Sequence, residues 1–383
     1  MINIGVLGCG AMGAGIAQVA VLNHCTVFVY DINADALVKA KQNLNNALSK
    51  LLEKNKISRQ QQELAHNNIT FTSSLNDLSN CSLVIEAVVE NIEIKKHLFN
   101  ELQKVVSSDC IIATNTSSLA IHAMAKTIQY PERFLGIHFF NPAFIMPLVE
   151  IIPTLLTSKN TIDKSLQIIQ SWGKTTVVAK DTPGFIVNRI ARPYYGEALR
   201  ILDENIADIY TIDWVMKNIG GFKMGPFELM DLIGHDVNYI VTETVWTQMY
   251  YDSKFKPSIT QKRLLEAGLL GKKTNRGFYD YSQPLPTEPT IKDKNLHQII
   301  FERILFMLIN EAFDALYYGI ASKNDIETAM QKGVNYPKGL LQWAEEIGVQ
   351  RVYLQLQSYY NLYQEERYRP SILLKKKRGA ITA

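Results

Sequence analysis

The chain has 383 residues, of which 47% are hydrophobic and 20% charged, so it can bury a sizeable core and is expected to divide into two or three domains. Its 40 basic residues nearly balance 37 acidic ones, and a net charge of +3 is too even to indicate a nucleic-acid-binding face. Four cysteines without a Cys-x-x-Cys spacing indicate a reducing compartment and neither a disulfide framework nor a metal site: Cys9, Cys25, Cys81 and Cys110.

The first predicted strand, residues 2–7, leads into a glycine-rich turn and then into a helix-like segment, residues 14–22. A Gly-x-Gly-x-x-Gly turn between a strand and a helix is typical of dinucleotide binding, because its glycines let the backbone approach a pyrophosphate at the helix N-terminus. The residues of this turn that we expect to contact a cofactor are Gly8, Gly10, Ala11, Met12 and Gly13.

The stretch from Ile4 to Leu22 is almost wholly apolar, as a signal peptide or a membrane span would be. Five glycines interrupt it and no basic segment precedes it, so a strand, a turn and a buried helix explain it better. We therefore expect no targeting or membrane segment, and a cytoplasmic location.

A second strand, residues 26–30, ends at Asp31, which lies 23 residues after Gly8. A carboxylate at this position accepts hydrogen bonds from the adenosine ribose hydroxyls and repels a 2′-phosphate, which favours NAD over NADP. The alternative is that Asp31 caps the helix that begins near Ala34.

Further apolar strands are expected at residues 69–72, 83–86, 111–115 and 134–138, with helical segments between them. This alternation predicts an α/β fold with a Rossmann-type, doubly wound and mostly parallel sheet, whose ligands bind at the carboxyl ends of the strands. Four polar residues fall at or just beyond such ends: Glu90, Asn115, Ser117 and His138.

One crossover, residues 34–65, is unusually long and reads as two helices. Its polar positions include several basic residues: Lys39, Lys41, Lys50, Lys54, Lys56 and Arg59. The charges alone favour a solvated helical hairpin. The alternative is a helical arm that binds the anionic part of a phosphorylated substrate.

His138 is followed three residues later by Asn141 and twelve residues later by Glu150. A histidine and a carboxylate together supply a general base and the group that orients it, so this segment predicts proton transfer. An isolated histidine beside aromatic residues is more often a core residue with its hydrogen bonds satisfied, and that alternative stands on this segment alone.

Beyond Pro183-Gly184 the strand pattern ends and long amphipathic helices begin. A constant offset of 114 residues relates many positions of this half, among them Arg189 to Arg303 and Glu197-Ala198 to Glu311-Ala312. A constant register indicates that an all-α C-terminal domain occurs in two copies. The second copy lacks a counterpart of Gly277-Phe278-Tyr279, so we interpret it as a packing partner and not as a second active site.

The predicted domains are an NAD-binding Rossmann domain at 1–181 with its helical arm at 34–65, a helical domain at 182–282, a linker at 283–299 and a degenerate second copy at 300–383.

Taken together, these motifs resemble the L-3-hydroxyacyl-CoA dehydrogenases over roughly residues 1 to 282. The matching segments are residues 8–13, 86–91, 115–119, 138–142, 181–189 and 225–228. The resemblance implies an enzyme that oxidises the 3-hydroxyl of an acyl-CoA ester while NAD takes the hydride. It also implies dimerisation through the helical domain, as a homodimer. Our own hypothesis is that the second copy packs on the first within one chain and forms a pseudo-dimer in place of that homodimer.

The resemblance also assigns roles residue by residue. His138 is the expected base, Glu150 holds its imidazole, and Ser117 and Asn188 bind around the reacting oxygen of the substrate. The residues expected to line the NAD site, besides the glycine turn, are Asp31, Glu90, Lys95, Asn115, Asn141 and Lys273. Lys54 matches a basic position that contacts the CoA phosphates in the family. The serine that accompanies this lysine in the family is replaced here by Ala47, so the CoA affinity that the resemblance implies does not carry over directly to this chain.

Two alternatives concern the substrate and the activity. Related dehydrogenases act on sugar acids or other 3-hydroxy acids without CoA, and a catalytically silent nucleotide-binding or structural relative is the other possibility. Residues 188–195 resemble members of the family that take 3-hydroxyadipyl-CoA, and Arg192 is explained equally well by pairing with a distal substrate carboxylate and by a surface or core ion pair.

Overall fold

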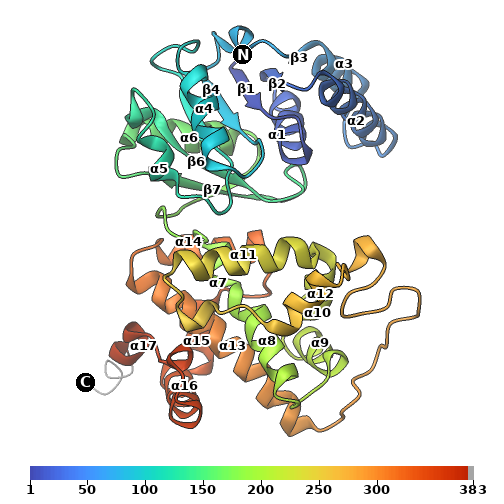
Figure 1. Ribbon diagram of the computed structural model, residues 1–383, viewed down its shortest axis with the longest axis vertical. Coiled ribbons are helices and arrows are strands. Elements are labelled where there is room, and N and C mark those ends of the chain that lie inside the picture. Colours follow the sequence, from blue (N-terminus) through green and yellow to red (C-terminus); the bar gives the residue numbers. More distant parts are fainter. Residues whose placement is uncertain (378–383) are drawn as a thin grey trace. The chain divides into compact units, whose positions relative to one another are not determined.

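The computed structural model describes residues 1–377, so residues 378–383, the end of the predicted second helical copy, lie outside the described part of the chain. The chain forms two compact units, and the boundary between them in the sequence lies between Asp181 and Thr182 (Figure 1). The first contains a sheet with flanking helices, and the second is helical.

The first unit has an eight-stranded sheet in the order β3-β2-β1-β4-β5-β6-β7-β8. Its strands are β1 (Asn3–Leu7), β2 (Thr26–Tyr30), β3 (Ile69–Thr72), β4 (Leu83–Glu86), β5 (Ile111–Thr114), β6 (Phe134–Phe139), β7 (Leu148–Pro153) and β8 (Thr175–Val178). Its helices are α1 (Ala11–Leu22), α2 (Ala34–Glu53), α3 (Arg59–Asn67), α4 (Ile92–Leu102), α5 (Ile121–Ala125) and α6 (Lys159–Ser171), with short 3₁₀ turns η1 (Leu75–Leu78) and η2 (Pro131–Arg133). The predicted doubly wound, mostly parallel sheet is confirmed.

The strands β1, β4 and β5 lie in the middle of the sheet and are almost entirely buried, as expected when helices cover both faces. The sequence predicted the first six strands but not β7 and β8. The strand β7 follows β6 without a crossover helix, so it pairs antiparallel with β6, and β8 then runs parallel to β7.

The predicted helical arm consists of α2 and α3, which contact each other. The apolar residues of α2 recur at helical spacing, and the buried ones are Leu37, Ala40, Leu44 and Leu48. A capping box of Ser58 and Gln61 starts α3.

The second unit contains the helices α7 (Val187–Ile190), α8 (Arg192–Asp203), α9 (Ile209–Asn218), α10 (Pro226–Ile233), α11 (His235–Gln248), α12 (Ile259–Glu266), α13 (Lys294–Tyr317), α14 (Lys323–Gly333), α15 (Leu340–Ile347), α16 (Val349–Tyr363) and α17 (Ile372–Lys377), with 3₁₀ turns η3 (Ser253–Phe255), η4 (Lys272–Thr274) and η5 (Glu366–Tyr368). The helix α13 begins inside the range predicted as linker, because Asp293 caps it by accepting hydrogen bonds from the next backbone amides. None of the helices in the described residues is long and apolar enough to cross a membrane.

Local structure repeats in this unit at the same offset of 114 residues. The helices α10 and α15 are equally long and in register, and each is followed by a glycine in a left-handed conformation, Gly234 and Gly348, with φ of 95° and 97°. Asp213 accepts hydrogen bonds from the first two backbone N–H groups of α10, at 2.9 and 2.8 Å. Glu327, at the equivalent position, accepts the corresponding pair from α15 at 2.7 and 3.4 Å.

Candidate active site

The glycine turn lies at the carboxyl end of β1. Its three glycines differ in whether the surrounding backbone leaves space for a side chain. Gly8 has a φ of +93°, and a Cβ there would lie 2.7 Å from the carbonyl oxygen of Ala87. A Cβ on Gly13 would lie 1.8 Å from the carbonyl oxygen of Gly8. Gly10 precedes α1 as its N-cap and has open space where its Cβ would be. The turn therefore leaves room for a ligand in front of the N-terminus of α1, where backbone amides favour a phosphate.

Asp31 lies at the carboxyl end of β2 and does not cap α2. The N-cap is Asn33, whose side chain accepts a hydrogen bond from Ala36 N at 3.1 Å, so the capping alternative for Asp31 is wrong. The Asp31 carboxylate accepts hydrogen bonds from Cys9 N and Asn33 N, both at 3.0 Å. Burial raises its pKa, but these backbone donors outweigh burial and hold the pKa below its ordinary value.

A buried ion network joins the ends of β4 and α4. The Lys95 ammonium is 1% exposed and lies 2.7 Å from Glu86 Oε1 and 3.1 Å from Glu90 Oε2. Glu86 also accepts a hydrogen bond from the Thr114 hydroxyl at 2.7 Å. Lys95 is thus held between two carboxylates as a buried positive charge beside Glu90. The sequence did not assign a role to Glu86.

Glu90 organises the loop that carries Ser117. Its Oε1 accepts hydrogen bonds from the Thr116 hydroxyl, from Ser117 N at 3.2 Å and from the Ser118 hydroxyl at 3.0 Å. Burial alone raises the pKa of Glu90, but Lys95 and the hydroxyl donors outweigh it, so the pKa lies below its ordinary value. An ionised Glu90 therefore fixes the backbone around Ser117.

His138 and Glu150 face each other across the antiparallel strands β6 and β7. His138 Nδ1 lies 2.7 Å from Glu150 Oε2, and the two side chains are 6% and 0% exposed. A carboxylate can only accept here, so we assign the Nδ1 proton to His138, which makes Nε2 the basic nitrogen. The ring of Phe140 packs 4.6 Å from the imidazole centroid. The pair has the geometry of an oriented general base.

The other predicted residues of this unit lie at the ends of β5 and β6 or on the helical arm. Asn115 accepts a hydrogen bond from Phe139 N at 2.8 Å, which ties the end of β5 to β6. Asn141 is exposed just beyond β6. On the arm, Lys54 is exposed at the C-cap of α2, and Ala47 lies about two helical turns before it.

Asn188 and Lys273 belong to the helical unit. The carbonyl oxygen of Asn188, on α7, accepts a hydrogen bond from Arg192 Nε at 2.9 Å. The Lys273 ammonium, on η4, forms an ion pair with Asp236.

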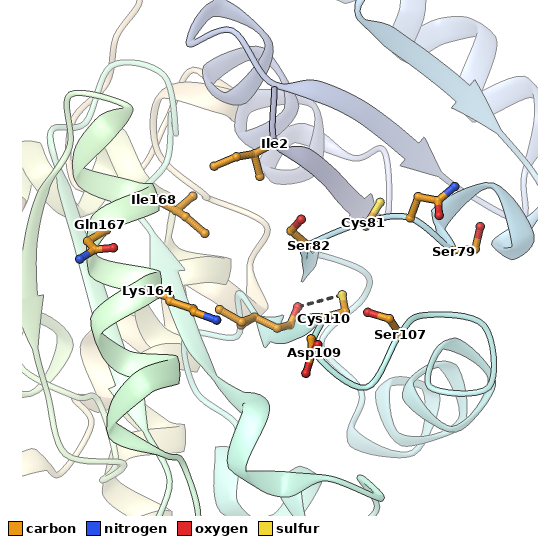
Figure 2. A pocket seen from close by; sticks show the side chains of 12 residues that line it. Ile2, Ser79, Cys81, Ser82, Ser107, Asp109, Cys110, Lys164, Gln167 and Ile168 are labelled. Atoms are coloured by element: carbon orange, nitrogen blue, oxygen red, sulfur yellow. Dashed lines mark hydrogen bonds between the residues drawn. The ribbon is translucent and has the colours of Figure 1, made fainter.

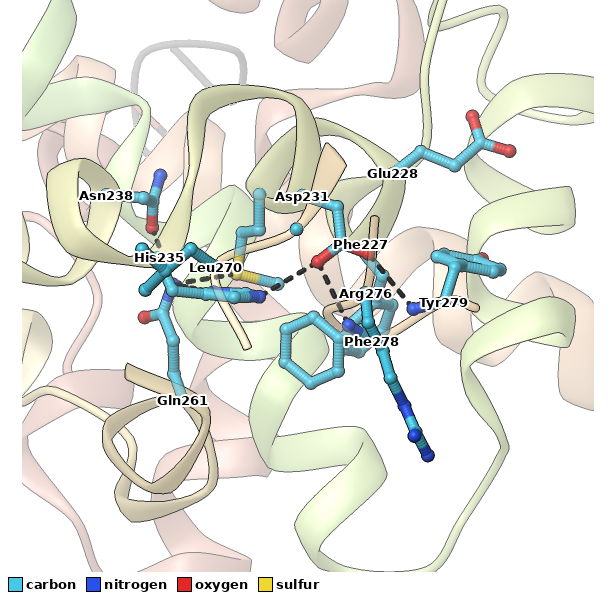
Figure 3. A network of polar contacts seen from close by, with 12 residues as sticks. Phe227, Glu228, Asp231, His235, Asn238, Gln261, Leu270, Arg276, Phe278 and Tyr279 are labelled. Atoms are coloured by element: carbon cyan, nitrogen blue, oxygen red, sulfur yellow. Dashed lines mark hydrogen bonds and ion pairs between the residues drawn. The ribbon is translucent and has the colours of Figure 1, made fainter. Parts of the chain in front are cut away.

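Asp231 holds the backbone at Phe278 and Tyr279, a few residues after Lys273; Figure 3 shows Asp231 and these two residues. Its carboxylate accepts hydrogen bonds from Phe278 N and Tyr279 N, both at 3.0 Å, and from His235 Nε2 at 2.8 Å. A Cβ on Gly277 would lie 2.1 Å from Asp231 Oδ1. Sequence reasoning missed this anchor, whose only signal was the Gly277-Phe278-Tyr279 segment that the second copy lacks.

A separate hollow of about 540 Å³ opens at the amino ends of β1, β4 and β5 (Figure 2). Its lining includes Ser82, Cys110 and Lys164. Ligands of open α/β sheets bind at the opposite, carboxyl ends of the strands, so this hollow is not the candidate site. Within residues 1–377 no group of three or more His, Cys, Asp or Glu side chains is placed to hold a metal ion.

Comparison with known proteins agrees with this geometry. Residues 3–182 match the model of the 3-hydroxyacyl-CoA dehydrogenase NAD binding domain. Residues 184–281 and 300–380 match that of the 3-hydroxyacyl-CoA dehydrogenase C-terminal domain.

Individual relatives match either nearly the whole chain or about three quarters of it. The 3-hydroxyadipyl-CoA dehydrogenase of Escherichia coli K12 is 35% identical, over 98% of both chains. The 3-hydroxybutyryl-CoA dehydrogenase of Bradyrhizobium diazoefficiens is 39% identical, over 74% of this chain and 98% of its own. A crystal structure of 3-hydroxybutyryl-CoA dehydrogenase from Escherichia coli K12 superposes with a TM-score of 0.94, at 34% identity and with 98% of both chains covered.

Proposed function

Because this chain belongs to the 3-hydroxyacyl-CoA dehydrogenase family, we propose that His138 is the general base of an NAD-dependent oxidation of a 3-hydroxyacyl-CoA to a 3-oxoacyl-CoA, and that Glu150 orients it. The enzyme class, the reaction and the use of NAD follow from family membership. The observation that supports the residue roles is the buried 2.7 Å contact between His138 Nδ1 and Glu150 Oε2.

The oxidation removes a proton and a hydride from one carbinol. His138 Nε2 takes the proton of the 3-hydroxyl as the carbonyl forms, and the negative charge of Glu150 stabilises the resulting imidazolium. NAD, when bound, accepts the hydride from C3. In the reverse direction the imidazolium returns the proton to the oxygen.

The chain's own residues fit this cofactor. The open space at Gly10 and the amides of α1 suit a pyrophosphate, and the ionised Asp31 suits a ribose diol. We propose that Glu90, Asn115, Asn141 and Lys273 complete the site, with Lys95 holding Glu90 in place. The remaining contacts of the turn are assigned to Ala11 and Met12.

Ser117 and Asn188 are the proposed donors to the reacting oxygen. Glu90 fixes the backbone of Ser117 and α7 carries Asn188, so both are presented by ordered structure and not by free loops. Lys54 is proposed to meet the CoA phosphates. Since Ala47 offers no hydroxyl beside it, we expect this contact to consist mainly of charge attraction.

The test of the proposed roles is a His138→Gln variant. Turnover of 3-hydroxybutyryl-CoA should be nearly abolished while NAD binding is retained. An unchanged turnover rate would show that His138 is not the general base. Comparing the CoA ester with free 3-hydroxybutyrate tests the substrate class, because only the ester should saturate the enzyme.

We further propose that the second helical copy takes the place of a dimer partner. Arg189 of the first copy donates from Nε to Glu311 of the second at 2.6 Å. Arg303 of the second copy donates from Nε to Glu197 of the first, also at 2.6 Å. The offset of 114 exchanges these two pairs, and such reciprocity is the signature of a two-fold interface.

Mass in solution tests this pseudo-dimer. The full chain should run as a monomer of 43.4 kDa, whereas a chain cut after Tyr281 should dimerise or aggregate through the uncovered face of α8. A stable, fully soluble monomer of the shortened chain would count against the proposal.

A further inference from the structure

Lys174 is a buried cation in the turn between α6 and β8, with a residue exposure of 9%. Its ammonium donates to the carbonyl oxygens of Ala143 and Met146, at 2.6 and 2.8 Å. Within residues 1–377 no carboxylate lies within ion-pair distance of this ammonium, and burial lowers the pKa of Lys174. Removing a cation from water is costly, and the hydrogen bonds to these two carbonyl groups offset that cost.

The two carbonyl groups belong to the segment 140–147, which joins β6, the strand of His138, to β7, the strand of Glu150. At the tip of this segment Phe144 and Ile145 are 44% and 61% exposed, so packing of these two side chains does little to hold it. The buried ammonium therefore fixes a part of the backbone that the side chains at the tip do not fix.

The end of the same segment is bound by the residue after Lys174. Thr175 N donates to the carbonyl oxygen of Pro147 at 2.8 Å, where β8 begins its parallel pairing with β7. Lys174 and Thr175 together thus bind three carbonyl oxygens of the segment. The edge strand β8 and the lysine before it therefore hold the connection between β6 and β7 on one side.

On another side the segment lies against α1. Ala143 is 1% exposed, and a Cβ on Gly15 would lie 3.1 Å from the Ala143 Cβ. Gly15 comes four residues after Ala11, the first residue of α1, which corresponds to about 6 Å along the helix. Lys174 therefore holds Ala143 about one helical turn from the N-terminus of α1, where the proposed pyrophosphate site lies.

Asn141 lies two residues before Ala143, at the start of the same segment, and is exposed. Two residues of chain span at most about 7 Å, so the position of Ala143 restricts that of Asn141. Within the described part of the chain the Asn141 side chain makes no hydrogen bond, which leaves its amide available to a ligand.

We propose that Lys174 is a positioning residue of the NAD site, which binds the carbonyl oxygens of Ala143 and Met146 so that Asn141 is presented to NAD near the N-terminus of α1. This role rests on the proposed place of Asn141 in the cofactor site. Without the ammonium the segment loses two hydrogen bonds, and Asn141 is no longer held in one position. NAD then has to order Asn141 when it binds, so its affinity falls.

A double-mutant cycle of Lys174→Met and Asn141→Ala tests this role, with the Kd of NAD measured for the wild type, both single variants and the double variant. Methionine is similar in length to lysine but has no N–H donor. Lys174→Met should weaken NAD binding about tenfold when Asn141 is present. In the Asn141→Ala background it should weaken binding by less than about twofold, because the residue that it positions is already gone. At saturating NAD, the KM for 3-hydroxybutyryl-CoA should change by less than about twofold in Lys174→Met.

Lys174→Gln, whose amide keeps N–H donors, is a milder second variant for the same cycle, with an expected loss of about threefold. The matched control is Lys159→Met, since the exposed Lys159 pairs with Asp163 at 2.8 Å and should leave the Kd and the KM unchanged. Equal losses of NAD affinity in the two backgrounds, or an NAD Kd that neither Lys174 variant changes, would overturn the positioning role. An Asn141→Ala variant that binds NAD as tightly as the wild type would instead overturn the proposed place of Asn141 in the cofactor site.

Discussion

Replacing Glu150 by Gln isolates the charge that supports the base. The side chain keeps its shape, but the neutral amide can no longer stabilise an imidazolium 2.7 Å away. With charge centres about 4 Å apart in a buried site of effective dielectric constant about 20, the lost attraction is about 4 kcal/mol. We therefore expect kcat to fall about 10³-fold.

The amide can also turn its NH₂ group towards Nδ1, which would place the proton on Nε2 and make His138 a donor towards the substrate. Loss of the charge and loss of the correct tautomer both lower kcat. The decrease of about 10³-fold expected from the charge alone is therefore a lower limit.

The assay is the steady-state appearance of NADH with 3-hydroxybutyryl-CoA, together with the Kd of NAD. The NAD Kd should change little, because Glu150 lies on β7 whereas the glycine turn follows β1, and β4, β5 and β6 stand between these strands in the sheet. A matched control is Glu101→Gln, since the solvent-exposed side chain of Glu101, near the end of α4, pairs with Lys104 just beyond this helix and should not affect kcat. A kcat within threefold of wild type, or an NAD affinity that falls as much as kcat, would refute the assigned role.

Three further predictions concern the cofactor site and the thiols. Asp31→Ser should lower the ratio of kcat/KM with NAD to kcat/KM with NADP. An equal ratio in the variant and the wild-type enzyme would contradict the role of Asp31 in cofactor selection. Gly13→Ala should destabilise the protein by several kcal/mol in urea unfolding, because its Cβ would lie 1.8 Å from a carbonyl oxygen, whereas Gly10→Ala should leave stability within about 1 kcal/mol and weaken NAD binding. Burial raises the pKa of Cys9, Cys81 and Cys110 to about 12 and also raises that of Cys25, so at pH 8 a thiol reagent should label none of the four before unfolding; rapid labelling of the native protein would contradict this.

The sequence was most informative where local chemistry and chain order coincide. A glycine turn between a strand and a helix, with Asp31 after the next strand, admits few folds, and the Rossmann-type sheet is confirmed. The spacing of His138 and Glu150 suggested their relation before their register across β6 and β7 was known.

Contacts between distant segments were not accessible in this way. The strand β7 was not predicted, because the alternation of strands and helices indicates parallel pairing and nothing local marks the reversal after β6. The hydrogen bonds of Asp231 to residues 278 and 279 depend on packing across 47 and 48 residues. Asp213 and Glu327 differ in type, so a search for identities passes over a helix cap that both copies contain.

The reciprocal pairing of the two helical copies has a consequence for behaviour in dilute solution. Two subunits that meet by diffusion separate when their concentration falls below the dissociation constant of their interface. The copies described here are joined by one chain, so their association is a unimolecular step whose effective concentration the connecting segment sets. The contacts of Arg189 and Arg303 therefore persist at any dilution, and helix packing at this interface does not vary with the amount of protein present.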